Sequence, residues 1–155
     1  MRFARLSTPI GALVLAGRDE LEAVSFDPHR GGDPVQPGWR RDDDAFPEAQ
    51  RQLGEWFAGD RRTFDLALPH GTAFQRRVWA TLCEIPYGAT RTYAEVAATL
   101  GTAPRAVGAA NGANPFAVIV PCHRLVGSAG LTGYAGGLDR KRWLLDFEAT
   151  ALSVR

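Results

Sequence analysis

The chain has 155 residues, a net charge of +1 and two cysteines, Cys83 and Cys122. A chain of this length can bury roughly 68–70% of its unfolded surface, so it needs no disulfide or metal for stability. The cysteines lie apart, with no CxxC pair or Cys/His cluster, which predicts that no metal is bound. No signal peptide or membrane span is visible. We therefore expect a cytoplasmic protein with reduced thiols and no membrane association.

The charge is divided unevenly along the chain. Residues 1–72 hold nine Arg against twelve acidic residues, a net charge of −3. Residues 73–155 hold nine basic and five acidic residues, a net charge of +4. The second half is therefore the side that would face a polyanion, although solvated surface alone can produce a difference of this size.

The first half predicts a small antiparallel sheet and one helix. Strand-like segments, separated by turn signals, cover residues 1–7, 12–16 and 21–26, and a surface loop follows over residues 27–44. A helix opens at Pro47 and should end near Gly59, with an apolar face made of Leu53, Trp56 and Phe57. An extended segment over residues 63–68 then leads to the predicted domain boundary at Pro69-His70-Gly71.

The second half predicts mostly helices. Thr72 is a suitable N-cap for a helix through Cys83, whose position beside the apolar stripe predicts a core residue. A capping-box pattern at residues 92–95 starts a second helix, which should end at Gly101. Pro104 opens a third helix. Two short helices joined by a tight glycine-containing turn resemble a helix-turn-helix.

The third of these helices consists of small residues, and Arg105 is its only charged residue. Glycine in a helix costs about 1 kcal/mol relative to alanine, so Gly108 needs close contact with another surface. A nucleic-acid backbone and a neighbouring helix are both candidates for that surface.

The run Val120-Pro121-Cys122-His123-Arg124 carries the clearest chemical signal. The β-branched residues 118–120 predict a buried strand that holds the cysteine at its end. A neighbouring base or cation can lower the pKa of a thiol from about 8.5 to roughly 3.5–7.5 and produce a nucleophilic thiolate. A lone cysteine near a strand is more often a core residue. The adjoining His123 and Arg124 favour the nucleophile.

The last helix places a carboxylate within an apolar stripe. At 100° per residue, one arc of about 100° holds Leu144, Leu145, Glu148 and Leu152. A carboxylate in such a stripe should be partly buried and have a partner. His123 would suit; the alternative is a stripe-edge position facing solvent or paired with Lys141.

From Gly71 to Glu148, about half of its length, the chain resembles the O6-alkylguanine-DNA alkyltransferases. The matching motifs, in the expected order, are Phe74-Gln75-Arg76-Arg77-Val78-Trp79, Ile85-Pro86-Tyr87-Gly88, Thr92-Tyr93, Arg105-Ala106-Val107-Gly108, Asn114-Pro115, Pro121-Cys122-His123-Arg124 and Gly133-Tyr134-Ala135-Gly136-Gly137. The expected fold is α+β. An antiparallel-sheet and helix domain over residues 1–70 supports a mostly helical domain over residues 71–155 with the helix-turn-helix and the active-site cysteine.

The resemblance implies a DNA repair protein that flips out O6-alkylguanine and moves the alkyl group irreversibly to its own cysteine. O4-alkylthymine is a second candidate substrate. No cofactor is used, and each chain repairs one lesion. By this resemblance Cys122 accepts the alkyl group, His123 acts as base through a water, and Glu148 orients the imidazole. Asn114 ties the active-site strand to the preceding turn, and Tyr134 donates toward the guanine O6 or its neighbouring atom.

The resemblance also implies contacts with double-stranded DNA, made by Tyr93, Arg105, Ala106, Gly108 and Arg124. Tyr93 lies by the backbone and helps to rotate the nucleotide out, and Arg105 fills the vacated space while its helix lies in the minor groove. Flipping is required because a paired base cannot reach a buried thiol. Unpairing and unstacking the base costs a few kcal/mol. We expect a monomer, associated with the nucleoid in a bacterium, and leave open whether it clusters cooperatively on DNA.

Three other functions agree less well with this sequence. A non-catalytic binder of alkylated DNA, recruiting other repair, would lack the acceptor cysteine that this chain has. A transcription regulator would need several base-reading side chains, whereas the third helix offers Arg105, Asn111 and little else. A cysteine hydrolase would need an oxyanion site and a route to turnover.

Overall fold

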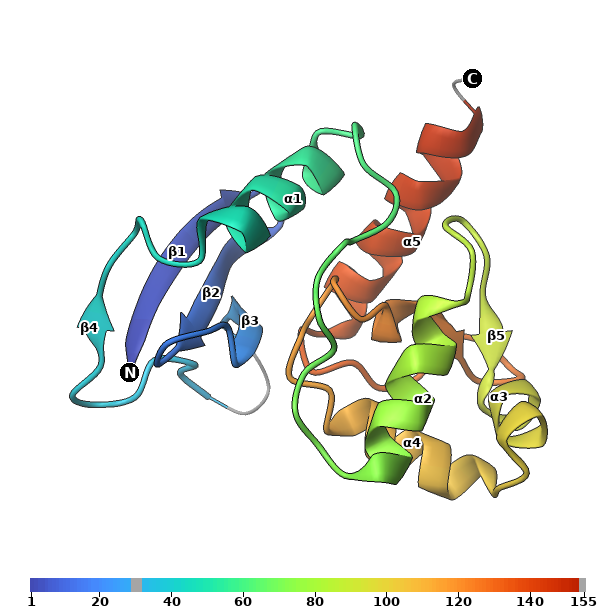
Figure 1. Ribbon diagram of the computed structural model, residues 1–155. Coiled ribbons are helices and arrows are strands. Elements are labelled where there is room, and N and C mark those ends of the chain that lie inside the picture. Colours follow the sequence, from blue (N-terminus) through green and yellow to red (C-terminus); the bar gives the residue numbers. More distant parts are fainter. Residues whose placement is uncertain (29–31, 154–155) are drawn as a thin grey trace.

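The computed structural model describes residues 1–28 and 32–153, and it consists of a sheet-and-helix half and a mostly helical half (Figure 1). Strands β1 (Arg2–Thr8), β2 (Gly11–Gly17) and β3 (Ala23–Asp27) form the predicted antiparallel meander, with Arg5 opposite Val14. Helix α1 (Pro47–Phe57) follows as predicted and buries Leu53 and Trp56. The predicted α+β fold is confirmed.

The predicted loop over residues 27–44 contains a short strand that the sequence did not indicate. Within it, residues 29–31 lie outside the described residues, and β4 (Arg40–Arg41) pairs in parallel with β1, giving the sheet order β3-β2-β1-β4. The backbone N–H of Asp42 donates to the carbonyl of Phe3 at 2.7 Å. Pairing with the free edge of β1 therefore holds residues 40–41 as a strand, and the β-strand propensity of these residues does not.

Residues 63–68 are joined to α1 by a side chain. The amide oxygen of Gln52 accepts from the backbone N–H of Asp65 at 2.9 Å, and its nitrogen donates to the Asp65 carbonyl at 3.2 Å. Gln52, which is 1% exposed, thus satisfies both backbone groups of Asp65, as a neighbouring strand would.

The second half contains α2 (Ala73–Cys83), α3 (Tyr93–Leu100), α4 (Pro104–Gly112) and α5 (Leu138–Ser153). Both predicted N-caps are confirmed: Thr72 and Thr92 each make a reciprocal capping box with the third residue of the helix. Gly101 ends α3 in the left-handed region at φ 67°, which lets the chain turn directly into α4. The prediction of a core Cys83 is wrong. This side chain is exposed because it lies one residue, about 100°, beyond the buried Leu82.

The buried strand predicted at residues 118–120 is also absent. These residues form a buried turn, with Val118 at φ 68° and the N–H of Val120 donating to the Phe116 carbonyl at 3.0 Å. A one-turn 3-10 helix, η1 (Cys122–Arg124), follows, and β6 (Leu125–Val126) then pairs in parallel with β5 (Arg91–Thr92). The β-branched run is thus explained by burial and not by strand geometry.

The two halves are joined through the outer edge of β3. The N–H of Val24 donates to the Pro115 carbonyl at 2.7 Å, and the N–H of Ala117 donates to the Val24 carbonyl at 3.0 Å. Hydrophobic residues of both halves form one continuous core. The segment that leads to Cys122 is therefore held by the N-terminal sheet. Within the described chain, no helix is long and apolar enough to cross a membrane.

Candidate active site

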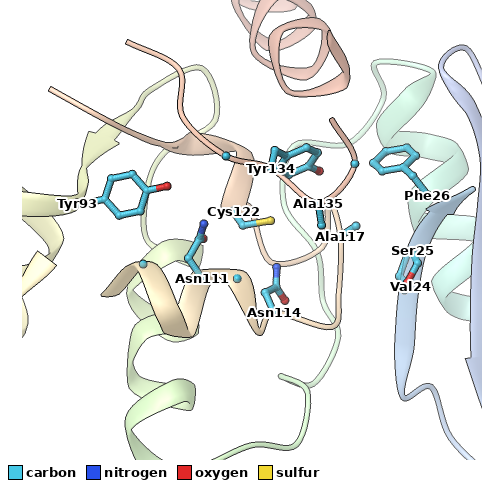
Figure 2. A pocket seen from close by; sticks show the side chains of 14 residues that line it. Val24, Ser25, Phe26, Tyr93, Asn111, Asn114, Ala117, Cys122, Tyr134 and Ala135 are labelled. Atoms are coloured by element: carbon cyan, nitrogen blue, oxygen red, sulfur yellow. The ribbon is translucent and has the colours of Figure 1, made fainter. Parts of the chain in front are cut away.

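A cavity of about 500 Å³ opens onto Cys122 between α4, residues 133–136 and β3 (Figure 2). Cys122 begins η1 and is 8% exposed. Polar side chains that line the cavity include Tyr93, Asn111, Asn114 and Tyr134. No metal-binding cluster of three or more His, Cys, Asp or Glu side chains was found among the described residues. The thiol thus lies in a cavity where a small organic group could meet it.

His123 and Glu148 form a fully buried pair behind the thiol. Nε2 of His123 lies 2.8 Å from Oε2 of Glu148, and both side chains are 0% exposed. Trp56 of α1 covers the imidazole, edge-on at 6.2 Å between ring centroids. A carboxylate on Nε2 favours the tautomer protonated there and leaves Nδ1 as a proton acceptor. This Nδ1 has no hydrogen-bond partner among the described residues.

Arg124, predicted to contact DNA, is buried in the same cluster. Its Nη2 donates to Glu148 Oε2 at 2.7 Å, and its Nη1 donates to the Ile85 carbonyl at 2.8 Å. The side chain is only 7% exposed. The DNA-contact prediction for Arg124 is therefore corrected: its guanidinium holds Glu148, and the N–H of Gly88 adds a further donor to that carboxylate at 3.0 Å.

These partners determine the charge of Glu148. Burial acts to raise the pKa of its carboxyl group, but the hydrogen bonds from His123 and Arg124, together with the charge of Arg124, outweigh burial and lower the pKa to about 2. Burial also lowers the pKa of His123, despite the opposing effect of Glu148. At neutral pH the pair therefore consists of a carboxylate and a neutral imidazole, which can act as a base.

The thiol itself is not activated in the resting protein. Burial raises the pKa of Cys122, against the opposing effects of the Asn114 side chain, the Lys141 charge and the backbone amides of Cys122 and His123. The sequence had suggested that a neighbouring base or cation lowers the pKa of this thiol; the structure shows that burial dominates. Reaction of Cys122 therefore requires removal of its proton.

Asn114 fixes the turn that carries the cysteine. Its Oδ1 accepts from the N–H of Phe116 at 2.9 Å, and its Nδ2 donates to the Val120 carbonyl at 3.0 Å. The side chain thus spans the turn from its first residue to its last. The structure places Asn114 where the sequence resemblance implied, but it supports a turn and not a strand.

Two buried polar atoms in residues that line the cavity have no partner among the described residues. They are the hydroxyl of Tyr134 and Oδ1 of Asn111. Burial raises the pKa of Tyr134 well above its usual value, so the hydroxyl keeps its proton and can donate. Unpaired buried polar groups are costly, so these two atoms are candidates to bind substrate. Sequence reasoning had assigned Asn111 no role in the active site.

Lys141 is a second residue that sequence reasoning missed. It is fully buried, and its Nζ donates to the carbonyls of Leu125 at 2.6 Å and Thr132 at 3.0 Å. It therefore does not pair with Glu148, and its charge acts to lower the pKa of Cys122. A signal was available, because Lys141 is the only lysine among eighteen basic residues and shares the helical face of Leu144 and Glu148.

The other predicted DNA-contact residues lie on α3 and α4, beside the cavity. Arg105 is exposed in the first turn of α4, and Ala106 follows half-buried. Tyr93 and Gly108 line the cavity, and a Cβ on Gly108 would lie 3.7 Å from Cε1 of Tyr93, an ordinary contact. Packing against Tyr93 therefore leaves room for alanine, so helix packing alone does not explain the glycine.

The fold and the cavity define a class of protein in which a helix-turn-helix and a buried Cys-His-Glu cluster share one site. Comparison with known proteins identifies the family. Residues 73–150 match the DNA binding domain, and residues 1–70 the ribonuclease-like domain, of 6-O-methylguanine DNA methyltransferase. The chain belongs to this family, whose members repair DNA by transferring an alkyl group to a cysteine of their own.

Relatives align over nearly the whole chain. A methylated-DNA–protein-cysteine methyltransferase of Methanosarcina acetivorans is 49% identical, covering 97% of this chain and 99% of its own length. One from Mycolicibacterium paratuberculosis is 48% identical, covering 96% and 92%. The crystal structure of Mycobacterium tuberculosis OGT in complex with DNA has a TM-score of 0.87 and 45% identity, covering 97% of this chain and 94% of that chain.

Proposed function

We propose that Cys122 is the residue that accepts the alkyl group, from O6-alkylguanine flipped out of duplex DNA. The supporting observation is the position of Cys122 in the cavity, directly before the buried His123–Glu148 pair. His123 takes the thiol proton at Nδ1, through one water molecule, while Glu148 holds the opposite ring nitrogen. O4-alkylthymine is a second candidate substrate of the same site.

The transfer is a displacement at the alkyl carbon. The Sγ–carbon bond forms as the carbon–O6 bond breaks, and the bonding electrons pass to guanine. Tyr134 donates its hydroxyl hydrogen bond toward the guanine O6, which makes guanine a better leaving group. The leaving guanine takes up a proton at N1 from water, and His123 passes the thiol proton to water, so that one proton moves overall from the thiol to guanine. The thioether has no comparable leaving group, so the reaction stops after one transfer per chain.

We further propose that α4 binds duplex DNA mainly from the minor groove. The exposed Arg105 enters the base stack as the damaged nucleotide leaves it, and Tyr93 lies by the DNA backbone. Because Ala106 has a small side chain and Gly108 has none, α4 can approach DNA closely, which suits a helix that enters a narrow groove. The protein would act as a monomer in the cytoplasm, at the nucleoid of a bacterial cell; cooperative clustering along DNA is a separate property to be measured.

The acceptor is tested by intact-mass measurement and peptide mapping after mixing with excess duplex that contains O6-methylguanine. We expect a gain of one methylene on Cys122 that stops at one per chain. Cys122→Ala should retain duplex binding and gain nothing, whereas Cys83→Ser should react like wild type. Duplex binding without any gain by the wild-type protein would instead favour the non-catalytic lesion binder.

Arg105 is tested by comparing duplex with free base. Arg105→Ala should slow repair of O6-methylguanine in duplex by about tenfold or more, because unstacking costs a few kcal/mol that the inserted side chain no longer offsets. Its rate on free O6-methylguanine should stay within about twofold, because no base has to be flipped. Equal losses on both substrates would remove the stack-filling role.

A further inference from the structure

The imidazole of His123 is covered by an aromatic cluster that begins in the N-terminal half. Trp56 of α1 is fully buried and meets the imidazole edge-on, with 6.2 Å between the ring centroids. The Trp56 ring also contacts Phe57 at 4.9 Å, Phe147 at 5.1 Å and Tyr87 at 6.2 Å. The candidate base is thus packed against a side chain from the other half of the protein.

The same cluster extends to the part of α5 that carries the partner of the base. Phe147, directly before Glu148, stacks on Trp143 with 4.9 Å between the ring centroids. Trp143 in turn lies 6.0 Å from Phe57, the residue after Trp56. Aromatic rings therefore separate the imidazole and the carboxylate from solvent on the side of α1.

The indole N–H of Trp56 does not explain why a tryptophan lies here. Its Nε1 is buried without a hydrogen-bond partner among the described residues, and an unpaired buried donor is costly. Trp79 of α2 differs, because it is 1% exposed and its Nε1 donates to the Ala110 carbonyl at 2.9 Å. Trp56 therefore contributes the apolar area of its ring, which it lays against His123.

The charges around the imidazole come from other elements than α1. The titratable groups on the segments packed around the His123–Glu148 pair are Tyr87, Cys122, Arg124, Lys141 and Glu148. Glu148 acts to raise the pKa of His123, Arg124 and Lys141 act to lower it, and burial, which also lowers it, is the largest effect. On α1 the charged side chains of Glu48, Arg51 and Glu55 pair with one another at the surface. Trp56 thus acts on the imidazole through burial and not through charge.

We propose that Trp56 is a positioning residue for alkyl transfer, which keeps water from the His123–Glu148 pair and so holds the imidazole in its neutral, proton-accepting form. This inference rests on the proposed role of His123 as base. An imidazole that is open to water gains a proton more readily beside a carboxylate, and a protonated imidazole cannot take the thiol proton. The N-terminal half thus acts on the reaction through a residue that need not touch the substrate.

The charge of the imidazole is measured by ¹⁵N NMR of His123 as the pH is varied, in a chain with three histidines. Trp56→Gln brings a polar side chain to the imidazole and should raise the pKa of His123. Trp56→Phe keeps an apolar ring, so it should leave the titration of His123 unchanged. Trp79→Gln is the matched control, because it puts the same polar side chain in place of a buried tryptophan on α2 and should not shift this titration. Trp56→Leu, with a smaller side chain, should shift the pKa in the same direction as Trp56→Gln and replaces that variant if it does not fold.

The rate of transfer from free O6-methylguanine tests the consequence for the reaction. Relative to wild type, the rate of Trp56→Gln should fall by about threefold or more from pH 8 to pH 6, because more of its His123 is protonated at the lower pH. The relative rates of Trp56→Phe and Trp79→Gln should be the same at both pH values.

Three results would overturn the proposal. An unchanged titration of His123 in Trp56→Gln and Trp56→Leu would do so and leave the proposed function intact. A shifted titration without a pH-dependent loss of transfer would remove the base role of His123, and the proposal with it. Unfolding of both variants would make Trp56 a structural residue alone.

Discussion

At the scale of single residues, the chemistry of the site depends on one carboxylate with several donors. Glu148 is fully buried; it receives hydrogen bonds from Arg124 and Gly88 and pairs with the buried His123. The sequence predicted the carboxylate and the histidine because each stands out in its segment. It could not predict the role of Arg124, because the same guanidinium would suit DNA equally well, and only the folded chain shows which anion it meets.

Glu148→Gln should therefore destabilise the protein in a pH-dependent way. At pH 7 the free energy of unfolding should fall by about 3–5 kcal/mol, because Arg124 is left buried without its anion. The pKa of about 2, against an ordinary 4.5, means that about 3 kcal/mol of stability is present above pH 4.5 and is lost as the pH falls toward 2. The gap between wild type and variant should thus narrow from pH 5 to pH 2.

Urea unfolding at pH 7, 5 and 3 measures this gap. Glu84→Gln is a suitable control, because Glu84 is an exposed glutamate outside the buried cluster. A gap that stays constant over this pH range would show that the stability lost in Glu148→Gln comes from packing and not from the charge.

At the scale of elements, sequence patterns predicted those strands and helices whose formation depends on residues close together in the chain. The meander and the capped helices follow from turn residues and N-caps, and both were predicted from the sequence alone. The turn at residues 118–120 and strand β4 were not, because each depends on distant contacts. Val118 adopts φ 68° within a turn that Asn114 spans, and β4 forms only where the edge of β1 is free. A β-branched run predicts burial more reliably than it predicts a strand.

Asn114→Ala should loosen this turn and change the thiol. We expect a loss of about 1–3 kcal/mol in the free energy of unfolding, because the Phe116 N–H loses its acceptor and the Val120 carbonyl keeps only the N–H of Cys122 as a donor. The Asn114 side chain also acts to lower the pKa of Cys122, so its removal should raise that pKa further. The pH profile of Cys122 alkylation by iodoacetamide should then move to higher pH.

The alkylation assay needs a Cys83→Ser background, because Cys83 is exposed and would react as well. Asn111→Ala provides the control: Asn111 lines the same cavity, but its Oδ1 has no partner among the described residues and it does not figure among the groups that lower the pKa of Cys122. Identical profiles for both asparagine variants would show that Asn114 has no specific effect on the thiol.

At the scale of the whole molecule, the two halves form one chemical unit. The edge of β3 bonds to the segment that leads to Cys122, Trp56 of α1 covers His123, and Phe26 closes the cavity. The sequence indicated only structural support for the first 70 residues. Contacts between the halves join residues more than a hundred positions apart, such as Ile10 and Arg140, and no local pattern encodes such pairs.

Arg140→Met tests whether the contacts between the two halves contribute to the free energy of unfolding. Arg140 donates to the carbonyls of Ile10, Asp27 and Pro28 in the N-terminal half and of Gly136 in the other. Wild type should unfold in one transition, and the variant should lose about 1–3 kcal/mol, or about 2–4 °C in Tm for each kcal/mol. Calorimetry measures both quantities, with the exposed neighbour Arg142→Met as control. Two separate transitions in the wild-type protein would show that the halves unfold independently. The hydrogen bonds of Arg140 would then not couple the stability of one half to that of the other.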